Sequence, residues 1–117
     1  MLLGELQDAI RAGSTRVGAH ATREAAADQL LISDIWDGIL GSAAEIIEDY
    51  PNDPRGPSCL VYCEVAGVPH HVVVAYPSAP AAQQIGISVL AFMLSCYRPG
   101  GPRYASKWSA DFKRRLP

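Results

Sequence analysis

The stretch EIIEDYPNDPRGPSCLVYCEVAGVPHHVVVAY, residues 45–76, decides the fold that this chain is predicted to adopt. It holds three runs rich in apolar, β-branched and aromatic residues, each followed by residues that favour turns. Such runs are typical of strands joined by tight loops. We therefore predict strands at Ala44–Tyr50, Ser58–Val65 and His70–Tyr76. The connection at 66–69, Ala-Gly-Val-Pro, is short enough for an antiparallel hairpin.

Upstream of this stretch the sequence predicts three helices. Leucines and Ile10 recur at helical spacing before Gly13, which indicates a short amphipathic helix over residues 2–12. An alanine-rich segment, Val17–Leu30, predicts the second helix. The third is expected to begin with Ser33 as its N-cap and to end at Gly41.

Downstream, residues 78–84 are small or polar and indicate a loop, and Ile87–Tyr97 indicates a long fourth strand. The final segment, Ala105–Arg115, is helical or irregular, with Trp108 and Phe112 expected to anchor it to the body. The predicted fold class is α+β: N-terminal helices, then a four-stranded antiparallel meander, then a short basic C-terminal segment.

Length and composition are those of one globular domain spanning residues 1–117. The chain is 49% hydrophobic and 19% charged. It has no run of eighteen apolar residues, and its first residues, MLLGELQDAIRAG, contain acids where a signal peptide needs basic residues. We therefore expect a cytoplasmic protein that makes no contact with a membrane.

Charge is distributed unevenly along the chain. The net charge is −2, but from Arg98 to the end six residues are basic and only Asp111 is acidic. A basic tail on an acidic body is able to contact phosphate, as in nucleic acid. The alternative interpretation is a solvated C-terminal helix.

The three cysteines favour a reducing compartment, because their number is odd. Cys59 and Cys63 would lie about 13 Å apart along one strand. That separation rules out a shared zinc ion and a disulfide within the strand. We interpret both as small core residues.

His20, Glu24 and Asp28 follow one another at intervals of four, so on a helix they form one polar stripe. His20 is a candidate general acid or base, oriented by Glu24. A second interpretation joins His20 and Glu24 to His71 in a site for zinc or manganese. A third is a solvated helix face without chemistry.

His70 and His71 are strand neighbours and must point to opposite faces of the sheet. Tyr97 and Arg98 stand where the last strand ends, a place where sites are often assembled. Arg98 is a candidate phosphate ligand and Tyr97 a candidate base-stacking or hydroxyl group. Alternatively, Arg98 forms an ion pair with Glu48 or Asp49. Phosphate-loop, nucleophile-elbow and zinc-knuckle motifs are missing from the sequence, and we predict neither cofactor nor metal.

Several segments, taken in order, resemble a bacterial family described as domain of unknown function 4258. The resemblance covers about residues 17–116. The matching segments are His20-Ala21 with Glu24-Ala25 and Asp28, Ser33-Asp34-Ile35, Glu45 to Pro51, Ser58 to Val61, His71 to Val74, Cys96 to Pro99, Trp108, and Lys113-Arg114-Arg115. Many members of that family carry an arginine at the place that Glu24 takes here.

That family is similar to small toxins of the RelE and BrnT type, which have one or two helices, a four-stranded antiparallel sheet and a basic end. The resemblance implies cleavage or blockage of RNA, with an antitoxin as a further partner. The candidate catalytic residues are His20, Glu24, His71, Tyr97 and Arg98.

Whether the protein is an enzyme stays open at this point. The first hypothesis is a metal-independent ribonuclease, in which a histidine takes the proton of a ribose 2′-hydroxyl and Arg98 neutralises the charge on phosphorus. The second is a non-catalytic interaction domain, such as a homodimer or an accessory to another protein, in which the strand Ala44–Tyr50 pairs with a partner strand.

Overall fold

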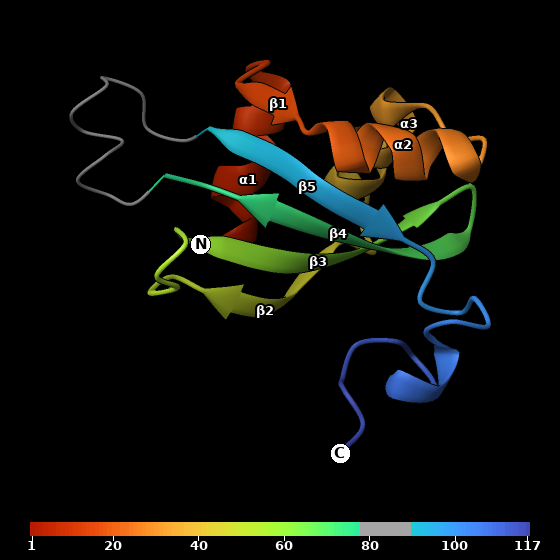
Figure 1. Ribbon diagram of the computed structural model, residues 1–117. Helices are drawn as coiled ribbons and strands as arrows, with labels where there is room; N and C mark the ends of the chain where they lie inside the picture. The colour runs from red at the N-terminus through yellow and green to blue at the C-terminus, as the bar shows by residue number, and fades with distance from the viewer. Residues whose placement is uncertain (78–89) are drawn as a thin grey trace.

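In the computed structural model, which describes residues 1–77 and 90–117, three helices pack on one face of a five-stranded sheet (Figure 1). The helices are α1 (Leu3–Arg11), α2 (Ala19–Ala27) and α3 (Ile32–Leu40). The strands are β1 (Thr15–Val17), β2 (Glu45–Tyr50), β3 (Ser58–Val65), β4 (Val68–Ala75) and β5 (Ala91–Tyr97). No helix in the described ranges has the length and apolar character needed to cross a bilayer.

The sheet is mixed, with the strand order β1-β5-β4-β3-β2, so the predicted four-stranded antiparallel meander is wrong. The unpredicted strand β1 pairs parallel to β5, with Thr15 opposite Ala91 and Val17 opposite Met93. Three residues are too few to show the alternation by which a strand is recognised in a sequence. The remaining three pairings are antiparallel, as predicted.

The hairpin between β3 and β4 is confirmed. Ala66 and Gly67 form a two-residue turn, with φ angles of 52° and 76°. Two successive left-handed residues match the right-handed twist of paired strands. Val65 consequently lies opposite Val68, and pairing continues without interruption to Ser58 and Ala75.

The helices were predicted in the right places but with imperfect bounds. The second begins at Ala19, because Gly18 still follows the sheet and donates its N–H to the Met93 carbonyl at 2.9 Å. It ends at Ala27, and Gln29 beyond it has a left-handed φ of 57°. The third helix has Leu31 as its N-cap, so the prediction of Ser33 in that role is wrong, whereas its end at Gly41 is confirmed.

Some predictions fall on residues outside the described ranges: the loop at 78–84 and the first residues, 87–89, of the predicted fourth strand. In the C-terminal segment, only Ala105–Lys107 is helical, as a 3-10 turn. Trp108 then pairs with Arg115 in an isolated bridge. Of the two alternatives for this segment, the irregular one is therefore correct for most of its length.

The main core lies between the helices and the sheet. Its strand residues alternate along β3, β4 and β5, and include the buried Cys59 and Cys63 of β3 and Cys96 of β5. The interpretation of Cys59 and Cys63 as core residues is thus confirmed. Burial raises the pKa of both thiols to about 12, so they stay protonated.

A close approach between α3 and β3 gives the first prediction. A Cβ atom added at Gly38 would lie 2.9 Å from the Glu64 carbonyl oxygen and 3.2 Å from the Val65 side chain. Gly38→Ala must push the helix away from the sheet, and we expect it to lower the free energy of unfolding by about 1–3 kcal/mol. Chemical denaturation followed by circular dichroism measures this.

Gly4→Ala is the matched control, since nothing lies within 4 Å of the added Cβ in α1. Alanine is the better helix former, so this variant should be neutral or more stable by up to about 1 kcal/mol. Equal stability of the two variants would show that α3 does not pack against β3 at this distance.

Candidate functional site

The last part of the chain crosses the sheet face that the helices leave free (Figure 1). We call residues 105–117 the C-terminal strap. Trp108 is buried, with its ring centroid 4.4 Å from that of His71. Two ion pairs tie the strap to β2, Lys113 to Glu45 at 3.1 Å and Arg115 to Glu48 at 2.7 Å. A basic tail therefore does lie against acidic residues of the body.

His71 is the centre of this attachment. Its Nε2 lies 2.6 Å from the Phe112 carbonyl oxygen, and its Nδ1 lies 3.1 Å from the Tyr97 hydroxyl. A carbonyl only accepts, so Nε2 carries the proton, and Nδ1 then accepts from Tyr97. Burial lowers the pKa of His71, although the Phe112 hydrogen bond partly opposes this, so the ring is neutral at pH 7.

His71 has no exposed surface, so any effect on a bound molecule passes through Tyr97. Burial raises the pKa of Tyr97 to about 12 and keeps its hydroxyl protonated. The Tyr97 ring stacks on Tyr104, with centroids 4.4 Å apart. The end of β5 thus presents a phenol held by His71 and Tyr104.

Next to Tyr97 the helix-free face is hollowed into a cavity of about 370 Å³, which we call the open-face groove. Its polar lining comes from β2, from the β2–β3 loop, from β5 and from the strap. These residues are Glu48, Tyr50, Asp53, Arg55, Tyr97 and Arg115, together with Ser58 at the start of β3. The floor is formed by Leu60 and Val73 among others. The volume falls within the range of small-molecule sites.

Glu48 and Arg115 form a two-point contact inside this groove. Arg115 donates from Nε to Oε2 at 2.7 Å and from Nη2 to Oε1 at 3.1 Å. The Tyr50 hydroxyl also donates to Oε1, at 2.7 Å. Burial raises the pKa of Glu48, but the hydrogen bonds from Arg115 and Tyr50 lower it more, and the net pKa lies below the ordinary 4.5. Glu48 is therefore ionised at neutral pH.

A second guanidinium enters the groove from the β2–β3 loop. Arg55 Nε and Nη2 lie 3.2 and 3.1 Å from the Asp53 carboxylate. Its side chain is 90% exposed and so remains accessible from solvent. The groove therefore combines two guanidinium groups, two carboxylates and two phenols.

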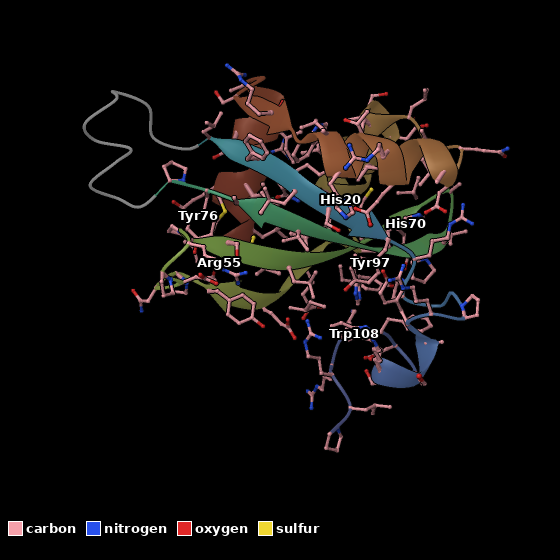
Figure 2. All side chains as sticks on the ribbon, viewed as in Figure 1. His20, Arg55, His70, Tyr76, Tyr97 and Trp108 are labelled. Atoms are coloured by element: carbon pink, nitrogen blue, oxygen red, sulfur yellow. The ribbon has the colours of Figure 1, made fainter. Side chains whose placement is uncertain are left out.

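His20 and Glu24 lie elsewhere, on the helix side of the sheet. In Figure 2, Tyr97 lies between His20 above and Trp108 below. His20 Nε2 is 3.2 Å from Glu24 Oε1, and the His20 side chain is 63% exposed. The structure thus brings His20 to Glu24 as predicted, but not to His71, which faces the opposite side. The ligand set proposed for zinc or manganese is consequently not assembled.

Glu24 has a clear structural task. Its Oε1 accepts hydrogen bonds from the Ser95 hydroxyl at 2.8 Å and from the Cys96 backbone N–H at 3.1 Å. Strand β1 covers the outer edge of β5 only as far as Met93. Beyond Met93 no strand of the described ranges covers this edge, and the Glu24 carboxylate accepts the hydrogen bond of the Cys96 N–H that a neighbouring strand would otherwise accept.

Arg98 points back toward α2, and its Nη2 is 3.4 Å from the Asp28 carbonyl oxygen. The alternative of an ion pair with Glu48 or Asp49 is not formed. Glu48 forms its ion pair with Arg115 instead, and Asp49 forms one with the N-terminal ammonium of Met1. Arg98 therefore lies on the far side of Tyr97 from the open-face groove.

His70 and His71 face opposite sides, as predicted, but both are buried. His70 Nδ1 donates to the Val68 carbonyl at 2.9 Å, and burial lowers the pKa of His70. In the described part of the chain, its Nε2 has no hydrogen-bond partner. His70 is thus a neutral core residue under the helices.

Sequence reasoning missed Glu48, Tyr50, Arg55 and Arg115 as candidate site residues. Glu48 and Arg115 are 67 residues apart, and no spacing rule connects them. The only available signal was the concentration of acids before Pro51 and of bases after Arg98. In the ranges 1–77 and 90–117, no group of three or more histidine, cysteine or acidic residues is arranged to hold a metal ion.

Comparison with known families gives one match. A family model described as Domain of unknown function (DUF4258) matches residues 17–85. This region runs from the end of β1 through β4, and so contains His20, Glu24, Glu48 and His71. The chain matches no curated protein and no solved structure.

The strap should depend on Trp108 far more than on its ion pairs. Trp108→Ala removes a buried ring, which typically costs about 3–5 kcal/mol. Glu48→Gln removes an ion pair whose arginine is 57% exposed, at a cost of at most about 1 kcal/mol. We expect rapid tryptic cleavage at Lys107 in the Trp108 variant and nearly unchanged resistance in the Glu48 variant. Mass spectrometry of timed digests measures both, and cleavage of the Glu48 variant as rapid as that of the Trp108 variant would mean that the ion pair of Glu48 with Arg115 holds the strap as strongly as Trp108 does.

Proposed function

The chain belongs to the family described as Domain of unknown function (DUF4258), and we propose that it binds RNA in the open-face groove and cleaves it without a metal. The contact of Arg115 with Glu48 carries this proposal. It places an ionised carboxylate, able to take a proton, next to a guanidinium that matches the geometry of a phosphate. These two groups suit the attack of a ribose 2′-hydroxyl on the adjacent phosphate.

Each step of the reaction has a candidate group in the groove. Glu48 takes the proton of the 2′-hydroxyl as the bond from O2′ to phosphorus forms. Arg115 and Arg55 neutralise the charge that develops on the phosphate oxygens. The Tyr97 hydroxyl, which donates to His71 Nδ1 in the resting protein, turns toward the 5′-oxygen and supplies its proton as the bond from that oxygen to phosphorus breaks. The products are a 2′,3′-cyclic phosphate and a free 5′-hydroxyl.

His71 acts on this reaction as a positioning residue. It accepts the Tyr97 hydrogen bond through Nδ1 while the Phe112 carbonyl fixes its Nε2 proton. The Tyr97 oxygen is thereby held at one point at the end of β5. This assignment differs from a direct proton transfer by histidine, since His71 is enclosed.

The similarity to toxins of the RelE and BrnT type belongs to this proposal as well. The helices on one face, the free face of the sheet and the basic strap support it. A toxin of this kind would have a protein antitoxin as its partner, and the open-face groove is the surface that such a partner has to block.

Cleavage should depend on Glu48 and vary with pH in a defined way. Purified protein with a 5′-labelled single-stranded RNA is expected to yield fragments ending in 2′,3′-cyclic phosphate. Glu48→Gln removes the base and should slow cleavage about 100-fold or more. Because the pKa of Glu48 lies below 4.5 and that of Tyr97 is about 12, the rate should be flat between these limits. It should fall as the pH drops through the Glu48 pKa.

Arg114→Gln is the control for a nonspecific loss of positive charge, because Arg114 neighbours Arg115 but does not line the groove. Its cleavage rate should match that of the wild type. Uncut RNA with the wild-type protein, under conditions in which another metal-independent ribonuclease works, would refute the proposal. So would equal rates for the wild type and the Glu48 variant.

A second candidate function is a non-catalytic interaction domain. Strand β2 is at one edge of the sheet. Its acids are already paired within the chain, Glu45 with Lys113, Glu48 with Arg115 and Asp49 with the N-terminus. Repulsion between two such edges is therefore reduced, and an exposed edge is able to pair with a strand of a second copy.

Sedimentation equilibrium over a wide range of protein concentrations tests this alternative. Pairing of two β2 edges predicts a mass that rises to that of a dimer. It also predicts that Ile47→Pro, which places a proline in this edge strand, keeps the protein monomeric. A monomer at all concentrations would contradict pairing with a second copy.

A further inference from the structure

A second cavity lies on the other side of Tyr97. It has a volume of about 330 Å³, is open to solvent, and is lined by the last turn of α2, the end of β5 and the loop that follows β5. Tyr97 lines this α2–β5 cavity as well as the open-face groove. The two cavities therefore meet at one side chain, and a molecule that extends past Tyr97 has access to both.

The charges around the α2–β5 cavity are balanced but not paired with each other. Glu24 in α2 and Asp28, the residue that follows α2, contribute carboxylates, and Arg98 and Arg103 contribute guanidinium groups from the chain after β5. Within residues 1–77 and 90–117, no ion pair joins either arginine to either acid. The cavity therefore presents carboxylates and guanidinium groups that do not form ion pairs with each other. Such a lining suits a ligand that has hydrogen-bond donors at one end and an anionic group at the other.

The remaining wall is aromatic. Tyr97 and Tyr104 both line the cavity, and their rings are stacked with an interplanar angle of 28°. Arg103 lies 5.8 Å from the centroid of the Tyr104 ring. Stacked aromatic rings beside arginines are the surroundings in which proteins hold unpaired bases. A planar base is therefore a better match than a flexible zwitterion such as an amino acid.

We propose that the α2–β5 cavity binds a guanine nucleotide. Guanine presents two adjacent donors, N1–H and the exocyclic amino group, and a carboxylate is able to accept from both. Asp28 is the acceptor that we assign, since the hydrogen bonds from Ser95 and Cys96 occupy Glu24 Oε1. Arg98 and Arg103 bind the phosphate. Because Tyr97 is shared, and on the basis of the proposed function, this nucleotide is the neighbour of the one that is cleaved.

Binding of mononucleotides to the full chain tests the assignment directly. Titration with 5′-GMP, followed by amide chemical shifts, should give saturable shifts at Arg103 and Tyr104. Asp28→Asn keeps the shape of the side chain but loses the double acceptor, so it should weaken GMP about tenfold while leaving AMP unchanged. Arg103→Gln should weaken both nucleotides to a similar degree, since it removes a phosphate contact.

Lys107→Gln is the matched control. Lys107 lies as near to the Tyr104 ring as Arg103 does, at 5.9 Å, but it does not line the cavity. Its GMP affinity should equal that of the wild type. Equal affinities for GMP, AMP and CMP, binding of inorganic phosphate as tight as that of GMP, or tighter binding of free glutamate would overturn the assignment.

The Glu48→Gln variant separates this inference from the cleavage proposal. Glu48 lies in the other cavity, so the variant should bind GMP as the wild type does even though it no longer cuts RNA. RNA cleavage without GMP binding would refute the guanine site alone. GMP binding without cleavage would refute the ribonuclease alone and leave a guanine-nucleotide site.

Discussion

The hydrogen bond from His71 Nε2 to the Phe112 carbonyl is the contact on which the helix-free face depends. An imidazole without exposed surface needs partners for both nitrogens, because an unpaired buried polar group costs about 1–3 kcal/mol. One partner, Tyr97, comes from the adjacent strand, and the other is a backbone carbonyl of the strap. The burial of His71 thereby fixes the strap to the sheet, and the Trp108 ring packs against the imidazole. Only then does Arg115 lie within reach of Glu48.

Some parts of the structure were predictable from the sequence and others were not, depending on whether local residues or distant contacts determine their conformation. Strand β3 and the hairpin that follows were predictable, because strand composition and turn residues are local signals. Strand β1 was not, since its three residues gain their conformation from pairing with β5. For the candidate site, the sequence named Tyr97 and His71 as candidates but did not indicate that the His71 side chain is fully buried. The contact of Glu48 with Arg115 arises only when the strap folds back, which no local pattern encodes.

The two faces of the sheet differ in what their polar residues do. On the helix side, Glu24 completes the edge of β5 by accepting the Cys96 N–H. An arginine at this place would have donors only and would be unable to do this. The acid is therefore suited to its own surroundings in this chain. On the other face, by contrast, the Glu48 carboxylate is held by the side chains of Arg115 and Tyr50, and 17% of its side chain is exposed.

A net charge of −2 does not decide whether this surface binds RNA, because the relevant charges are local. In the open-face groove each arginine is already held by a carboxylate, Arg55 by Asp53 and Arg115 by Glu48. An incoming phosphate must therefore compete with a carboxylate for each guanidinium. Such a groove attracts RNA weakly at long range, since the opposite charges of each ion pair offset one another and salt screens what remains over about 8 Å. In the proposed complex, recognition then depends on short-range contacts. Phosphate replaces carboxylate at the two guanidinium groups, and bases stack against the rings of Tyr97 and Tyr104. In the proposed reaction, the same exchange would draw Arg115 away from Glu48 and so free the carboxylate when it has to accept a proton.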